Sequence, residues 1–186
     1  MNYGKRIKLH GEFGNMKHIL VTGSEGYIGT IMVEMLLNKG YKVTGLDTCF
    51  FEKGNLNNAQ IKTYNLIKKD IRDIIEKDLE DEKFDAIIHL AALSNDPLGM
   101  LNEELTFDIN YHASVNLAKI AKRLGIKRFI FSSSCSLYGD GNGKILDEQS
   151  LSNPQTAYGK SKILAENDIS KLADENFSPT FMRNAT

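Results

Sequence analysis

The sequence predicts an α/β fold built on a doubly wound parallel sheet. Short apolar runs alternate along the chain with longer segments of helical periodicity, and no internal repeat or low-complexity linker interrupts them. A strand, a helix and a second parallel strand form a right-handed unit, and consecutive units give a sheet covered by helices. A chain of 186 residues is long enough for one such domain with a sizeable core.

The same pattern places the individual elements. Strands are expected at residues 19–21, 42–46, 61–66, 84–90, 127–131 and 179–182, where β-branched and aromatic residues cluster. The first helix has apolar residues at positions 28, 31, 32, 35 and 36, and Gly40 is expected to end it. Further helices are expected after residues 70–73 as far as about 81, and at 103–124 and 156–176.

Composition excludes several classes of function. The 23 basic and 24 acidic residues leave a formal charge of −1, which offers no electrostatic case for binding nucleic acid or an anionic membrane. No apolar run approaches the ~20 residues of a membrane-spanning helix. Cys49 and Cys135 fit neither a metal site nor a disulfide framework, so a cytoplasmic location is expected. Residues 1–15 lack the apolar core of a signal peptide, and we expect a disordered extension before a domain at 16–186.

A glycine-rich turn after the first expected strand is the main indication of function. In the segment KHILVTGSEGYIG, Gly23 permits a tight turn, Gly26 lets the backbone approach a pyrophosphate, and Gly29 lets the helix pack close to the sheet. Unpaired N–H groups at the start of the helix then face the phosphates. The GxxGxxG spacing is a variant of the dinucleotide fingerprint, and it favours a dinucleotide-binding Rossmann fold over a purely structural turn.

Asp47 stands at the end of the second expected strand, where an acidic residue binds the two hydroxyls of an adenosine ribose. A carboxylate there also repels a 2′-phosphate, which favours NAD over NADP. The alternative is an aspartate that only caps a turn. Ligands of such sheets bind beyond the carboxyl ends of the strands, where the glycine turn, Asp47, Ala91-Ala92 and the serines of 132–136 all fall. The sequence therefore converges on one crevice.

Three residues expected at this crevice indicate a reaction. Tyr158 and Lys162 share one helix face because they are four residues apart. A neighbouring ammonium lowers the pKa of a tyrosine from its reference of about 10, which suits an acid or base. Ser134 is placed to hydrogen-bond the same substrate oxygen. The Tyr-x-x-x-Lys spacing recurs at Tyr64 and Lys68, but no strand-end serine precedes that pair, so the catalytic role is assigned to Tyr158.

Together these motifs resemble the extended short-chain dehydrogenase/reductase family, most closely its UDP-glucose 4-epimerase-like branch. The resemblance covers residues 17–186 and rests on VTGSEGYIG, Asp47, DIRD, HLAA, Asn110, FIFSSSCSLYG and YGKSK, in the family's order. It implies a NAD-dependent enzyme that acts on a nucleotide-sugar and forms a homodimer through the helices around 103–124 and 156–176. It also implies that the family's smaller C-terminal substrate-binding portion is missing from this chain.

The resemblance also assigns residues to the site. It implies that Ser134, Tyr158 and Lys162 are catalytic and that Asn110 supports their geometry. The residues implied to bind NAD are Gly23, Ser24, Glu25, Gly26, Tyr27, Ile28, Gly29, Asp47, Asp70, Ile71, Leu90, Ala91, Ala92, Asn110, Ser132, Ser133, Tyr158 and Lys162. No metal site is implied.

The implied activity is that of a nucleotide-sugar epimerase. Tyr158 takes the proton of a sugar hydroxyl while hydride passes to NAD, and the keto-sugar then regains the hydride on its other face. Related dehydratases carry an Asp-Glu pair where this chain has Cys135 and Ser136, so dehydration is disfavoured. Cys135 and His89 are interpreted as structural. The alternatives are an NAD(P)-dependent sugar-nucleotide reductase or dehydrogenase, and a truncated, non-catalytic NAD-binding module.

Overall fold

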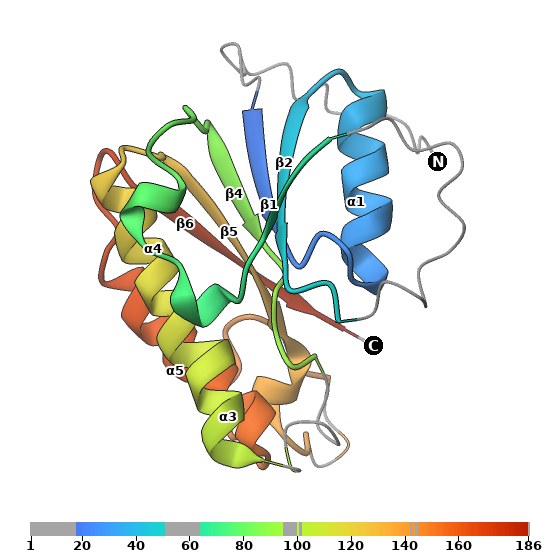
Figure 1. The fold of residues 1–186 in the computed structure, drawn as a ribbon. Coiled ribbons are helices and arrows are strands. Elements are labelled where there is room, and N and C mark those ends of the chain that lie inside the picture. Colours follow the sequence, from blue (N-terminus) through green and yellow to red (C-terminus); the bar gives the residue numbers. More distant parts are fainter. Residues whose placement is uncertain are drawn as a thin grey trace, which may run out of the picture.

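A six-stranded parallel sheet forms the centre of the molecule, in the order β3-β2-β1-β4-β5-β6 (Figure 1). The computed structural model describes residues 18–50, 64–94, 100, 102–141, 143 and 145–185. The order reverses direction between β1 and β4, as expected for a doubly wound sheet, which confirms the predicted fold class. The strands are β1 (His18–Thr22), β2 (Lys42–Asp47), β3 (Asn65–Lys68), β4 (Ala86–His89), β5 (Arg128–Ser134) and β6 (Ser178–Asn184).

Helices cover both faces of the sheet (Figure 1). Helix α1 lies on one face, and α3, α4 and α5 lie on the other. A π-helical segment joins α3 to α4, so the helix predicted at 103–124 is present as one helical run with a local widening. The helices are α1 (Tyr27–Asn38), α3 (Glu103–Phe107), the π segment (Asp108–Ala113), α4 (Ser114–Arg123) and α5 (Ala157–Ser170).

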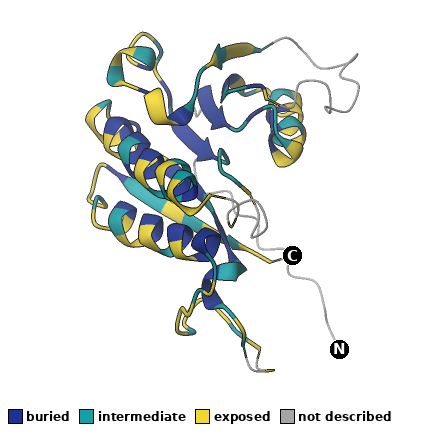
Figure 2. Cartoon of the chain, turned by 60° about the horizontal axis from the view of Figure 1, so that its bottom comes forward, coloured by how far each residue is buried: buried dark blue, intermediate teal, exposed yellow. Residues whose placement is uncertain are grey.

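Two hydrophobic cores lie between the sheet and these helices. Beneath α4 and α5 the sheet contributes the fully buried Phe129 and Phe131, and beneath α1 it contributes Ile19 and Val21. All five residues of β1 are buried, as expected for a central parallel strand covered on both faces. Figure 2 shows the buried sides of the helices turned toward the sheet and their exposed sides turned away.

The predicted charged helix up to about residue 81 is wrong. The chain there forms two 3₁₀ turns, at Ile71–Asp73 and Glu76–Asp78. Carboxylates compete for the backbone donors that a helix would use, since Asp70 accepts from Arg72 N at 2.9 Å and Asp78 accepts from Ile75 N at 2.8 Å. Ile71, Ile74 and Leu79 are buried from this irregular segment.

The predicted apolar stripe on the first helix is right at Leu36, which is buried, and at Met32, which packs against the core, but the rest of it is exposed. Gly29, Val33 and Leu36 are buried, whereas Ile28 and Met35 are 53% and 52% exposed. Close packing at Gly29 turns the helix so that the 29–33–36 face meets the sheet. Gly40 does follow the helix with a φ of +85°, which confirms the predicted helix end.

Other boundaries differ by a few residues. Helix α5 ends at Ser170 instead of 176, because Asp174 Oδ1 accepts from the amides of Asn176 and Phe177 at 2.8 and 2.9 Å and closes a turn. Strand β5 continues to Ser134, three residues beyond the predicted end at Phe131. The expected extension at 1–15 and the start of the third predicted strand, 61–63, lie outside the described residues.

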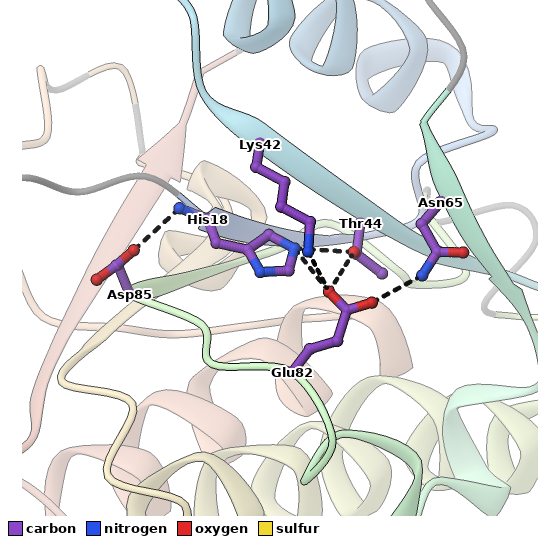
Figure 3. Close-up of polar contacts among 6 residues, drawn as sticks. All are labelled: His18, Lys42, Thr44, Asn65, Glu82 and Asp85. Carbon is purple, nitrogen blue, oxygen red and sulfur yellow. Dashed lines mark hydrogen bonds and ion pairs between the residues drawn. The ribbon is translucent and has the colours of Figure 1, made fainter.

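A polar network ties the amino ends of three strands together (Figure 3). Glu82, in the loop before β4, accepts from Lys42 Nζ at 3.0 Å and from Asn65 Nδ2 at 2.9 Å, and His18 Nε2 lies 3.1 Å from its Oε2. Burial, together with the charge of Lys42, lowers the pKa of His18. One carboxylate thus holds β1, β2 and β3 at the end of the sheet remote from their carboxyl termini.

Replacing this carboxylate is expected to destabilise the fold. The Glu82→Ala variant should lose about 1–3 kcal/mol of unfolding free energy, because the donors of His18, Lys42 and Asn65 lose a common acceptor. Urea denaturation followed by circular dichroism measures the change. The matched control is Glu80→Ala, which removes an exposed glutamate from the same loop and should change stability by less than about 0.5 kcal/mol. Equal losses in the two variants would contradict the role of the network.

Candidate cofactor site and active site

A cavity of about 780 Å³ opens at the carboxyl ends of β1, β2, β4 and β5. This is the edge of the sheet where the sequence predicted a crevice. The predicted residues that line the cavity are Gly23, Glu25, Gly26, Tyr27, Ile28, Gly29, Asp47, Asp70, Ile71, Leu90, Ala91, Ala92, Ser132, Ser133, Ser134, Tyr158 and Lys162. The structure therefore brings most of the predicted site together.

Two glycines let the turn after β1 pass close to other backbone. Gly23 has a φ of +70°, and a Cβ there would lie 2.8 Å from the Ala91 nitrogen. A Cβ at Gly29 would lie 2.0 Å from the Gly23 carbonyl oxygen. Gly26 is the N-cap of α1, and it offers no side chain to cap the first turn. The first amides of α1 are therefore available to a phosphate, with the positive end of the helix dipole behind them.

Asp47 occupies the next position along the cavity. Its Oδ2 accepts from Glu25 N at 3.0 Å and its Oδ1 accepts from Cys49 N at 2.7 Å, which fixes the carboxylate between the glycine turn and the loop after β2. Each carboxylate oxygen has a second lone pair, so hydrogen bonds from ribose hydroxyls remain possible. Asp70 lies farther along, where its hydrogen bonds with Arg72 lower the pKa of its carboxyl although partial burial opposes the shift.

Two predicted residues do not line the cavity but support its wall. The side chain of Asn110 is fully buried and forms a pair of hydrogen bonds with the backbone of Leu93, at 2.8 Å to its N–H and 3.0 Å to its carbonyl. Asn110 thus clamps the loop after β4, which is consistent with the supporting role predicted for it, and its assignment as a cofactor-binding residue stays a prediction. Ser24 is fully buried beneath the glycine turn.

His89 completes the support of this wall. On one side of the ring, Thr22 Oγ1 lies 2.6 Å from His89 Nδ1 and accepts from Ala91 N at 3.3 Å. On the other side, His89 Nε2 lies 2.7 Å from Ser114 Oγ, and this hydroxyl donates to the Asn110 carbonyl. Because Ser114 gives its proton to the Asn110 carbonyl, its Oγ must accept from His89 Nε2, and Nδ1 then accepts from Thr22. The ring is therefore the neutral tautomer with its proton on Nε2. Burial, together with the charge of Lys162, lowers the pKa of His89 to about 3. The structural role predicted for His89 is consistent with these contacts.

The three residues predicted to be catalytic meet at the opposite side of the cavity. Tyr158 and Lys162 project from α5, and Ser134 ends β5; all three are at least nine-tenths buried. Ser134 Oγ accepts from Ser136 N at 3.2 Å, which leaves its own proton for another acceptor. Thr156 caps α5 by accepting from Gly159 N at 3.1 Å, so the first turn that carries Tyr158 is fixed.

Lys162 is the charged centre of this group. Its Nζ donates to the Ser132 carbonyl at 2.8 Å and lies 4.7 Å from the centroid of the Phe131 ring and 5.6 Å from that of Tyr158. Burial lowers the pKa of Lys162 to about 8, and the nearby Glu166 partly opposes this. An ammonium beside a tyrosine ring favours the phenolate, so the pair can exchange a proton with a bound hydroxyl.

The residues present fit a dinucleotide. Ser133 lines the cavity and is 2% exposed, and its buried hydroxyl has no hydrogen-bond partner among the described residues. An unpaired hydroxyl at this depth is costly unless a ligand supplies its partner. The glycine turn also brings the start of α1 to the cavity, where its first amides would receive a pyrophosphate.

Some residues of the site were missed from the sequence. Tyr64 was set aside as the weaker Tyr-x-x-x-Lys pair, yet its hydroxyl donates to Glu25 at the glycine turn. Thr22 and Ser114 were not singled out, although they hold His89. The sequence contained one indication of the close approach of Tyr64, because Gly45 interrupts an apolar strand. A Cβ at residue 45 would lie 2.5 Å from the Tyr64 ring.

Neither a metal site nor a membrane span is found among the described residues. No group of three or more His, Cys, Asp or Glu side chains in this part of the chain is placed to hold a metal ion. Among the helices that the structure describes, none has the length and apolar character needed to cross a membrane.

Comparison with known proteins agrees with this geometry. A model of the NAD dependent epimerase/dehydratase family matches residues 19–186. The UDP-glucose 4-epimerase of Neisseria meningitidis serogroup A is 32% identical over 185 residues, covering 90% of this chain and 52% of that protein. The solved UDP-Glc/GlcNAc 4-epimerase of Campylobacter jejuni superposes with a TM-score of 0.82 at 27% identity, covering 90% of this chain and 53% of that one.

A second solved structure shows the same relation. The UDP-N-acetylglucosamine 4-epimerase of Methanobrevibacter ruminantium, in complex with UDP-N-acetylmuramic acid, superposes with a TM-score of 0.80 at 31% identity, over 90% of this chain and 54% of that one. The chain therefore spans about half the length of these relatives.

The buried histidine gives a pH dependence of stability. Because the pKa of His89 is about 3 in the folded chain and about 6.5 when unfolded, only the unfolded state binds this proton between those values. Unfolding free energy should therefore fall as pH is lowered from 6.5, by up to roughly 1.4 kcal/mol per pH unit from this residue. Urea denaturation across this range should show a shallower slope for His89→Gln.

The matched control is His112→Gln, which removes an exposed histidine from the π-helical segment. It should keep the slope of the parent chain. If His89→Gln and the parent lost stability at the same rate with falling pH, the neutral state of His89 would be contradicted.

Proposed function

Because the chain belongs to the NAD dependent epimerase/dehydratase family, we propose that it provides the cofactor-binding and catalytic residues of a NAD-dependent nucleotide-sugar epimerase. The observation that carries the proposal is that one cavity holds both the glycine turn and the buried Ser134, Tyr158 and Lys162. The relatives named as UDP-glucose and UDP-N-acetylglucosamine 4-epimerases support a UDP-hexose as the substrate.

The cavity would hold NAD along the carboxyl ends of the strands. The first amides of α1 would receive its pyrophosphate, Asp47 the adenosine ribose, and Ala91 and Ala92 the nicotinamide side. When bound, NAD supplies a reversible acceptor for hydride from the sugar. The small side chains after β4, clamped from behind by Asn110, leave room for a flat ring against the strand end.

The chain's own residues would move the proton. Tyr158 would accept the proton of a sugar hydroxyl at its phenolic oxygen and later return it, and the adjacent Lys162 ammonium would stabilise the phenolate between these steps. Ser134, whose Oγ proton is not used by the bond from Ser136, would donate to the same sugar oxygen. All three are at least nine-tenths buried, so few directions of approach other than the cavity are open to them.

We further propose a cytoplasmic homodimer. Both cysteines, Cys49 and Cys135, are free thiols, as expected in a reducing compartment. Leu164 is 39% exposed on the outer face of α5, which offers an apolar contact for a second copy. Sedimentation equilibrium of the chain should give twice the monomer mass of 20.8 kDa, and a monomer at micromolar concentration would contradict the dimer.

Removal of the Tyr158 hydroxyl should abolish the proton transfer. We expect Tyr158→Phe to lower the rate of interconversion of UDP-glucose and UDP-galactose by about 10²–10⁴-fold while NAD binding is retained. A coupled assay for UDP-glucose measures the rate. The control Tyr111→Phe removes a hydroxyl that bonds Asp168 outside the cavity and should leave the rate unchanged. Equal rates for Tyr158→Phe and the parent would refute the assignment.

The fate of the reducing equivalents separates an epimerase from a dehydrogenase. An epimerase returns the hydride to the sugar, so the second epimer should form with many turnovers for each NADH that accumulates. Absorbance at about 340 nm, recorded together with product formation, measures this ratio. Accumulation of one NADH for each sugar consumed would instead identify a dehydrogenase that uses the same residues.

A further inference from the structure

Glu25 stands in the glycine turn directly beside Asp47. Its backbone N–H donates to Asp47 Oδ2 at 3.0 Å, and both residues line the same cavity. The turn and the end of β2 are thus fixed to each other at the point where an adenosine ribose would bind. Two acidic residues therefore line this end of the cavity, although ribose hydroxyls need only one acceptor residue.

Tyr64 holds the Glu25 side chain in place. Tyr64 immediately precedes β3, its ring packs against the core beneath α1, and its hydroxyl donates to Glu25 Oε1. Burial and the bond to Glu25 raise the pKa of Tyr64, with a further contribution from the charge of Asp47, so the hydroxyl stays protonated and remains a donor. Tyr64 therefore ties the Glu25 side chain to the segment before β3, while the Glu25 backbone is tied to Asp47.

The sequence makes room for this contact. A Cβ at Gly45 would lie 2.5 Å from the Cε2 atom of Tyr64, so the ring can cross β2 and reach the turn only because residue 45 has no side chain. The contact joins three separate segments: the glycine turn, β2 and the residue before β3. Such a built-in arrangement distinguishes Glu25 from a carboxylate that merely points into solvent.

Two cations that the structure describes near this end are already engaged. Lys69, which lines the cavity, donates to Asp78 at 2.7 Å, and Arg72 donates to Asp70 at 2.7 Å. Neither side chain is placed to neutralise Glu25 and Asp47 without breaking an existing pair. These two described cations are therefore already paired with Asp78 and Asp70.

We propose that Glu25, held by Tyr64, is a second specificity-determining residue that acts with Asp47 to exclude cofactors bearing a phosphate on the adenosine 2′-oxygen. A 2′-hydroxyl donates a hydrogen bond to a carboxylate, whereas a 2′-phosphate brings a charge of about −1.5 to −2 and only acceptor atoms. Two fixed carboxylates repel such a group at close range and cannot hydrogen-bond to it. The proposal rests on the NAD site of the proposed function.

Calorimetric titration with NAD and with NADP tests this role. The measured quantity is the ratio of the NADP to the NAD dissociation constant for each variant. We expect Glu25→Gln to lower this ratio about tenfold, because one unit of like charge is removed beside the 2′-position. Tyr64→Phe should lower it by a smaller factor, since Glu25 keeps its charge but loses the bond that orients it.

The matched control is Glu34→Gln, which removes the same charge from the exposed face of α1 and should leave the ratio unchanged. A ratio in Glu25→Gln equal to that of the parent would overturn the role of Glu25 while the parent's binding of NAD still supported the proposed function. Failure of the parent chain to bind NAD would overturn both. An equal decrease in Glu34→Gln would mean that only net charge matters, which also contradicts the proposal.

Discussion

The close approach of the turn after β1 to its own helix and to β4 is the constraint on which the rest of the site depends. A Cβ at Gly29 would lie 2.0 Å from the Gly23 carbonyl, and one at Gly23 would lie 2.8 Å from the Ala91 nitrogen. These contacts fix the start of α1 over the strand ends. They also decide which face of α1 meets the sheet, because packing at Gly29 buries Val33 and leaves Ile28 exposed.

The walls of the cavity are made rigid by buried polar contacts instead of by apolar packing alone. His89 links β1 to the helical run on the far face of the sheet, and Asn110 clamps the backbone of Leu93. Each of these groups is satisfied, so their burial costs little and they specify one arrangement. The cavity thus combines fixed walls with a few groups, such as the Ser133 hydroxyl, whose partners a ligand would supply.

The sequence was a good guide wherever a backbone requirement or a strand end carried the information. The glycine spacing, Asp47 and the Tyr158–Lys162 pair predicted the cavity and most of its lining, because parallel strands bring their carboxyl ends to one edge. Local periodicity was a poorer guide. The segment after Asp70 has apolar residues at helical spacing, but carboxylates capture its backbone donors and 3₁₀ turns form instead.

Contacts between distant segments could not be predicted. Tyr64 reaches Glu25 across β2, and the two residues are 39 positions apart, so neither periodicity nor spacing indicates the contact. Asn110 was expected to support the site, but its partner, the backbone of Leu93, could not be named from the sequence. In both cases the position of the side chain is set by tertiary packing. Gly45, which leaves room for the Tyr64 ring, is the one feature of the sequence that indicated either contact.

The central claim is that a dinucleotide binds along the carboxyl ends of the strands at the glycine turn. The most direct test is a titration of the isotopically labelled chain with NAD, followed by amide NMR shifts. The account predicts that the amides of residues 25–29 and 90–92 shift in saturable fashion, while those of His18 and Lys42 at the opposite end of the sheet do not. Shifts confined to another surface, or no shifts at millimolar NAD, would contradict it.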